Sequence, residues 1–133
     1  MRVMQYSKVN VLTGSLDEWL QGREVPVIAV MKNYDMLGYL IYMDDSKAYP
    51  TLDWLNAKDF SITDKNCPNY WDERKWSFWK PYIKTMNGMN FDFRITYYYG
   101  PKAILDDPNF LFDVVENRKK ALDFYYDNMA NVY

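Results

Sequence analysis

Residues 108–129 constrain the fold most, because they carry a long helix signal. The Asp107 carboxylate can cap the first turn by accepting from N–H groups that have no partner within the helix. Pro108 suits the first helical position. Apolar side chains then recur at helical spacing, at Leu111, Val115, Leu122, Tyr125, Tyr126 and Met129. The pattern predicts one helix of roughly 30 Å that covers a sheet. The alternative is that part of this stripe faces a partner or a second copy.

Apolar and alternating stretches elsewhere predict a mostly antiparallel sheet. The chain order favours strands at 3–12, 25–34, 38–43, 49–52 and 60–64, with a short helix at 16–21. The Asn87-Gly88 pair favours a hairpin turn between residues 82–86 and 89–99. Alternation along 89–99 predicts that Tyr97 and Tyr99 are buried and that Arg94 and Tyr98 face solvent.

The strand order between residues 25 and 65, with a helical turn at 55–58 before a last short strand, resembles a small SH3-like barrel. This resemblance is topological and implies no functional site. An ordinary antiparallel meander explains the same pattern. The expected fold is therefore a single α+β domain over residues 1–133. Its mostly antiparallel sheet, SH3-like or partly barrelled, is covered by a long C-terminal helix and a short N-terminal helix.

Composition excludes several classes of chemistry. The chain has no histidine, which removes Ser-His, Cys-His and His-based zinc sites. Cys67 is the one cysteine, so an internal disulfide cannot form, and this suits a reducing compartment. No signal peptide and no run of about 20 apolar residues is found. We expect a cytoplasmic protein that does not enter a membrane.

The acidic residues give little support for catalysis. Asp44-Asp45, Asp72-Glu73 and Asp106-Asp107 are adjacent pairs, whose side chains point in different directions and seldom converge on one ligand. Turns and helix starts explain each pair equally well. We therefore expect no catalytic residue, no metal site and no cofactor. A histidine-free, metal-dependent hydrolase built from distant carboxylates stays open as an alternative.

Residues 65–81 are dense in aromatic and charged side chains and lack periodicity, which favours a long loop with a short helix at 71–79. From residue 67 to residue 102 the chain carries six basic and three acidic residues, against a net charge of −2 for the whole chain. Exposed aromatic residues beside cations are typical of binding surfaces. The predicted partner-binding residues are Trp71, Arg74, Lys75, Trp76, Trp79, Tyr82, Arg94 and Tyr98. A structural plug at the end of the sheet is the alternative.

These features favour a small, non-catalytic protein-binding module with an aromatic-rich surface. Proteins of this size without enzyme motifs are common among phage and mobile-element products that inhibit a host enzyme, for example a defence nuclease. A single-stranded nucleic-acid-binding protein that uses the aromatic and basic residues of 70–99 is the second hypothesis. A homodimer is compatible with both.

Overall fold

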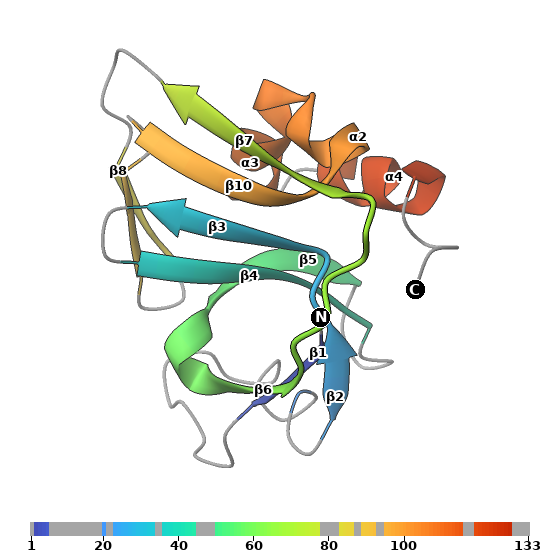
Figure 1. The fold of residues 1–133 in the computed structure, drawn as a ribbon. Coiled ribbons are helices and arrows are strands. Elements are labelled where there is room, and N and C mark those ends of the chain that lie inside the picture. The colour runs from blue at the N-terminus through green and yellow to red at the C-terminus, as the bar shows by residue number, and fades with distance from the viewer. Residues whose placement is uncertain are drawn as a thin grey trace.

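A five-stranded antiparallel sheet forms the centre of the protein in the computed structural model. The model describes residues 2–5, 20, 23–33, 36–44, 50–77, 83–86, 89–92, 95–115 and 119–128. The strand order of the sheet is β5-β4-β3-β10-β7 (Figure 1). Its strands are β3 (Ala29–Asn33), β4 (Met36–Met43), β5 (Thr51–Asn56), β7 (Trp71–Ser77) and β10 (Ile95–Pro101). With its C-terminal helices, the sheet confirms the α+β class.

A second, three-stranded sheet lies beside the first. It has the order β2-β1-β6 and consists of β1 (Arg2–Gln5), β2 (Glu24–Pro26) and β6 (Phe60–Asp64). The chain passes from β2 into β3 through residues 27–28, and from β5 into β6 through the 3-10 helix η1 (Ala57–Asp59). The predicted turn and last strand are thus present. The five-stranded sheet is nevertheless open, so its SH3-like or barrel character is not confirmed.

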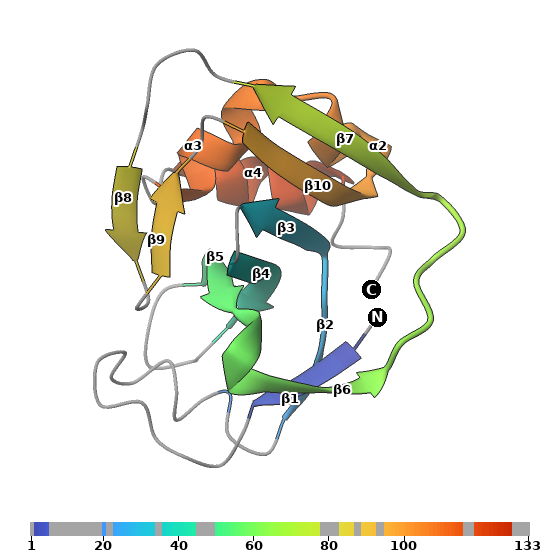
Figure 2. The same cartoon turned by 60° about the vertical axis from the view of Figure 1, so that its left-hand side comes forward.

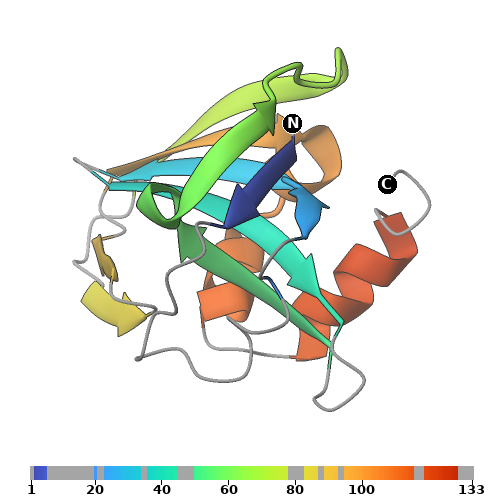
Figure 3. The same cartoon turned by 90° about the horizontal axis from the view of Figure 1, so that it is seen from below.

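The C-terminal part of the chain forms α2 (Lys102–Leu105), α3 (Pro108–Val115) and α4 (Lys119–Asn128). Figure 3 shows α3 and α4 as separate helices where one long helix was predicted, and residues 116–118 between them lie outside the described part. The predicted start is confirmed, because Asp107 Oδ1 accepts from the Asn109 N–H at 3.0 Å. None of the described helices is long and apolar enough to cross a membrane.

The central sheet separates two hydrophobic cores. The first lies under the helices and joins Met31, Leu40 and Trp54 of the sheet to Phe110, Val114 and Tyr125 (Figure 2). The second lies towards the smaller sheet and contains Leu20, Val25, Val27, Tyr39, Ile41, Met43, Leu55 and Phe60. Strands β3 and β4 alternate between the two cores, which explains why their sequences are apolar at successive positions. Leu20 is helical, and the rest of the predicted 16–21 helix lies outside the described residues.

Two predictions for the middle of the chain need correction. Residues 71–77 form strand β7 and pair along their whole length with β10, where a loop with a short helix was predicted. The helix-favouring run Glu-Arg-Lys is overridden because β10 offers a complete set of backbone hydrogen-bond partners. The predicted strand 89–99 is divided into β9 (Met89–Asp92) and β10. Strand β9 pairs with β8 (Ile83–Met86), with Met86 opposite Met89 and Lys84 opposite Phe91. The predicted turn at Asn87-Gly88 lies outside the described residues.

Helix α4 is fastened to the sheet by three tyrosine side chains. Tyr42 of β4 stacks on Tyr125 with ring centroids 4.5 Å apart and 12° between the planes. The hydroxyl groups of Tyr42 and Tyr126 are 2.7 Å apart and share a hydrogen bond. Desolvation by burial, followed by the hydrogen bond to Tyr126, raises the pKa of Tyr42. Burial likewise raises the pKa of Tyr125. Tyr42 and Tyr125 therefore hold their protons more tightly in the folded state than in the unfolded chain.

We predict that Asp107→Ala lowers the free energy of unfolding by about 1 kcal/mol, because the first turn of α3 loses its capping carboxylate. Urea denaturation monitored by circular dichroism measures this change. Asp123→Ala, at an exposed position of α4, is the control and should change stability by less than about 0.5 kcal/mol. An equal loss in both variants would contradict the capping role.

We predict that stability falls as the pH rises above about 10, the ordinary pKa of tyrosine. The folded state keeps the Tyr42 proton beyond this pH while the unfolded chain loses it, so the stabilisation is complete below pH 10 and is lost above it. Tyr42→Phe keeps the ring but has no ionisable hydroxyl, so the free energy of unfolding of this variant should fall less steeply with pH. Urea denaturation between about pH 8 and pH 11 tests this difference. Tyr70 is exposed, and Tyr70→Phe is the control. Its free energy of unfolding should depend on pH as steeply as that of the unmodified protein.

Candidate binding surface on the five-stranded sheet

Three neighbouring strands place a tyrosine between two lysines on the sheet face opposite the helices. Strand β10 lies between β3 and β7, and its Tyr97 is directly opposite Lys32 on one side and Lys75 on the other. Directly opposite residues of antiparallel strands share a face, so the three side chains form a line across the sheet. Leu37 of β4 extends the line, because it is paired with Lys32. We call Lys75, Tyr97, Lys32 and Leu37 the Tyr97 row.

All four members of the Tyr97 row are exposed. Tyr97 has 36% and Leu37 has 38% of its surface accessible, and Lys32 and Lys75 are exposed as well. The Nζ atom of Lys75 lies 5.7 Å from the centre of the Tyr97 ring, within cation–π range. The row therefore presents an aromatic ring, an aliphatic side chain and two cations on a rigid backbone.

A second row runs beside the first and becomes more buried towards the second core. Tyr99 of β10 is opposite Val30 of β3 and Glu73 of β7. Desolvation, together with the charge of the Glu73 carboxylate and a hydrogen bond to it, raises the pKa of Tyr99. Val30 packs against the second core. The exposed surface thus carries one acidic side chain, Glu73, next to the two lysines.

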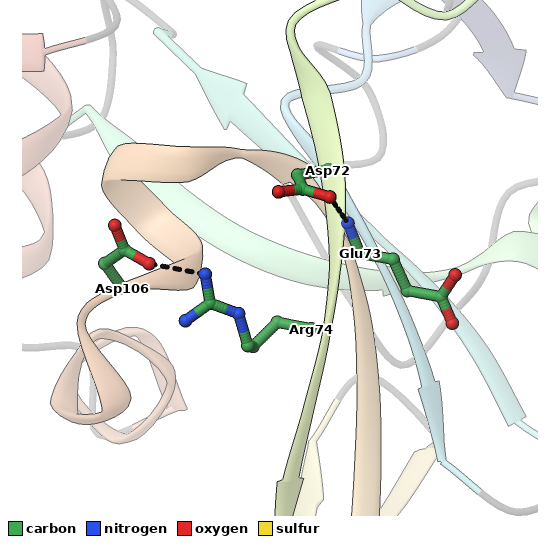
Figure 4. A network of polar contacts seen from close by, with 4 residues as sticks. All are labelled: Asp72, Glu73, Arg74 and Asp106. Atoms are coloured by element: carbon green, nitrogen blue, oxygen red, sulfur yellow. Dashed lines mark hydrogen bonds and ion pairs between the residues drawn. The ribbon is translucent and has the colours of Figure 1, made fainter.

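Arg74 leaves β7 on the opposite side from Glu73 and reaches the helices (Figure 4). Its Nη2 atom is 2.6 Å from Oδ1 of Asp106, the residue that follows α2. Asp72 accepts a hydrogen bond from the Glu73 N–H at 2.8 Å. Both partners of the ion pair are more than a third exposed, so solvent limits its contribution to roughly 1 kcal/mol or less. Arg74 therefore tethers the edge strand to α2. Asp72 and Asp107 serve as local hydrogen-bond acceptors, and Asp106 is an ion-pair partner.

The predicted site residues are distributed over both faces of the sheet. Lys75 is exposed in the Tyr97 row, whereas Trp71 is half-buried against the second core. For Trp76 the structure describes the backbone only, which lies opposite Thr96 in the strand pairing. Trp79, Tyr82 and Arg94 lie outside the described residues. The structure therefore places one predicted residue, Lys75, on this exposed surface and gives Arg74 a partner within the protein.

The prediction that Tyr98 faces solvent is wrong. Tyr98 is 3% exposed and belongs to the core under the helices, where its ring lies 6.0 Å from that of Trp54. Its neighbour Thr96 is fully buried and accepts a hydrogen bond from Nδ2 of Asn33 at 2.9 Å. Burial raises the pKa of Tyr98 well above its ordinary value. Its phenol is therefore a neutral core group and no part of a contact surface.

The inverted faces of β10 have a physical cause. Three consecutive tyrosines, Tyr97 to Tyr99, put the same side chain on both faces of this part of the strand. The alternation that predicted the buried face comes from residues 89–96, of which 89–92 form β9 in a different sheet. The helices cover the face of Tyr98. Gly100 brings β10 close to β3 on this side of the strand, because a Cβ atom there would lie 2.9 Å from the Cβ of Ala29.

Sequence reasoning therefore missed Tyr97, Lys32 and Leu37 as surface residues. One signal was present for Lys32, which is the one charged residue between Val25 and Tyr34. No signal in the sequence aligns it with Tyr97, because that pairing joins segments 65 residues apart.

Among the described residues, no group of three or more Cys, Asp or Glu side chains is arranged to hold a metal ion. Cys67 is an exposed thiol in the segment between β6 and β7.

Comparison of the chain with protein-family models, with curated proteins and with solved structures finds no match.

Proposed function

We propose that this protein is a small, non-catalytic binding module that uses the Tyr97 row to contact another protein. The observation that carries the proposal is the line of exposed side chains across β7, β10, β3 and β4, with Tyr97 between two lysines. Tyrosine combines a large apolar ring with a hydroxyl and loses little conformational entropy on binding, which is why it is common at the centre of protein interfaces.

The composition of the surface favours a protein partner with acidic side chains. Two carboxylates on the partner would meet Lys75 and Lys32, while an apolar group between them would cover Tyr97 and Leu37. Leu37 adds an aliphatic contact that a phosphate backbone would not use. Glu73 would repel phosphate groups at the edge of the same surface. Both residues therefore support a protein over a nucleic acid.

In this proposal the module acts by covering a functional surface of its partner, as an inhibitor of a host enzyme does. A defence nuclease would present a suitable acidic target if metal-binding carboxylates line its cleft. The proposal places the module in the cytoplasm, where its one cysteine, Cys67, stays reduced.

We predict that Tyr97→Ala weakens binding to the cellular partner by at least about tenfold, because a central tyrosine at an interface typically contributes more than 1.4 kcal/mol. The immobilised protein and its variants are incubated with a bacterial lysate, and retained proteins are quantified by mass spectrometry. The expected partner is retained by the unmodified protein, lost with Tyr97→Ala, and reduced with the double variant Lys32→Glu/Lys75→Glu.

Tyr70→Ala is the matched control for this experiment. Tyr70 is also exposed, at 45%, but lies in the turn before β7 and outside the row. The same partner should be retained by this variant. Retention that is identical for Tyr97→Ala and Tyr70→Ala would show that the row is not the contact surface, and no retained protein at all would remove the proposal.

A second candidate function is supported by the same ring and its two lysines. Exposed aromatic rings on an open sheet, with cations on either side, stack and steer single-stranded nucleic acids. If this is the function, a labelled single-stranded oligonucleotide binds at low salt, its affinity falls steeply as salt is added, and Tyr97→Ala weakens it. No shift in fluorescence anisotropy at about 20 mM salt would exclude this candidate.

A further inference from the structure

Strand β7 is an open edge of the five-stranded sheet. It pairs with β10 on one side and with no other described strand on the opposite side. An open edge presents backbone N–H and C=O groups that can pair with another strand. The four residues at its centre, Asp72 to Lys75, are consecutive charges with the acids first and the bases second. Asp72, Glu73 and Lys75 are exposed, and Arg74 is partly exposed.

Glu73 and Lys75 carry opposite charges two positions apart on one face of the strand, so they can pair with each other when two copies of the strand lie antiparallel. Two identical antiparallel strands in one sheet are related by a twofold axis perpendicular to the sheet, and this axis keeps each residue on its own face. Two residues that lie opposite each other must therefore come from the same face of the strand, so their positions differ by an even number. The twofold axis then passes between the two copies of one residue, which is the centre of the pairing. Four centres are available within the charged run, at Asp72, Glu73, Arg74 and Lys75.

Only the centre at Arg74 pairs opposite charges and leaves no like-charge pair without a compensating partner. Centring on Asp72 or on Glu73 places two carboxylates directly opposite each other, and centring on Lys75 does the same with two ammonium groups. Centring on Arg74 places Glu73 opposite the partner's Lys75, and Lys75 opposite the partner's Glu73. Arg74 then lies opposite the partner's Arg74, but each guanidinium already has a carboxylate of its own at 2.6 Å, from Asp106.

We propose that two copies of this chain pair antiparallel through β7, about a twofold axis at Arg74, to form a continuous ten-stranded sheet. Two Glu73–Lys75 cross-strand pairs fix the register on the face that carries the Tyr97 row. On the helix face, the Arg74–Asp106 ion pair removes the repulsion between the two guanidinium groups. Nucleic acid and membranes are poorer occupants of this edge, because they cannot complete a row of backbone hydrogen bonds that alternates donors and acceptors.

The dimer would place the two Tyr97 rows on one face of a single sheet, and this would allow two-site binding to a partner. Lys75 belongs to both proposals, because it is a member of the Tyr97 row and the cross-strand partner of Glu73 in the dimer. Loss of dimerisation is therefore assigned with Glu73→Lys, which changes no member of the row. Loss of partner binding is assigned with Tyr97→Ala, which changes no cross-strand charge.

Sedimentation equilibrium of the purified chain tests the dimer. We expect self-association with a Kd in the micromolar range, as for a small interface. Glu73→Lys or Lys75→Glu alone should weaken it by about tenfold or more, because each change places like charges opposite each other twice. An equimolar mixture of E73K and K75E should recover association, because the two variants then face each other with complementary charges. The double variant E73K/K75E should also self-associate.

Three outcomes would overturn the proposal. The first is a chain that stays monomeric up to about 1 mM, well above the Kd expected for an interface of this size. The second is a dimer that neither single reversal weakens, and the third is a mixture of E73K and K75E that associates no better than either alone.

Lys58→Glu in η1 makes the same charge change as K75E at an exposed position away from β7 and should leave association unchanged. Circular dichroism establishes that each variant folds, and E73Q and K75Q provide a neutral pair expected to weaken association less than the reversals.

Discussion

The structure depends on burying both faces of β3 and β4. Met31 and Leu40 point into the core under the helices, while Tyr39 and Ile41 point into the core towards the smaller sheet. A strand that is apolar on both faces is stable only if both are covered, so these two strands require a layer on each side. The helices supply one layer, and Val25, Val27 and Phe60, from β2, the link that follows it and β6, contribute to the other.

The exposed surface arises because this second layer does not extend over the whole sheet. Tyr39 is 3% exposed, whereas Leu37, two residues before it on the same face of β4, is 38% exposed. Burial therefore decreases along the strands, towards the end of the sheet where the Tyr97 row lies. The Tyr97 row lies where the cover ends, on backbone that β3, β10 and β7 hold in register. This combination of a rigid backbone and exposed side chains is what a contact surface requires.

The charged side chains of β7 extend from both faces of the strand. Arg74 is directed to Asp106 and connects the edge of the sheet to α2. Glu73 and Lys75 are on the other face, beside Tyr99 and Tyr97. A charged edge discourages unselective strand pairing, and in β7 the order of the charges would permit pairing with a second copy in one register. The same four residues would then contribute to stability, to the exposed surface and to self-association.

The sequence by itself determined the local elements whose signals are short in range. The Asp107 cap and Pro108 start of α3, the β6 strand at residues 60–64, the pairing of β8 with β9 and the absence of histidine chemistry are all contained in neighbouring residues or in composition. Only the tertiary structure decided the conformation of residues 71–77, which form a strand because β10 is available to pair with them. It also decided which face of Tyr97–Tyr99 is buried, because the covering helices pack on the face of Tyr98 against the local alternation. The line from Lys75 through Tyr97 to Lys32 is set by pairings between distant segments, and no local pattern contains that information.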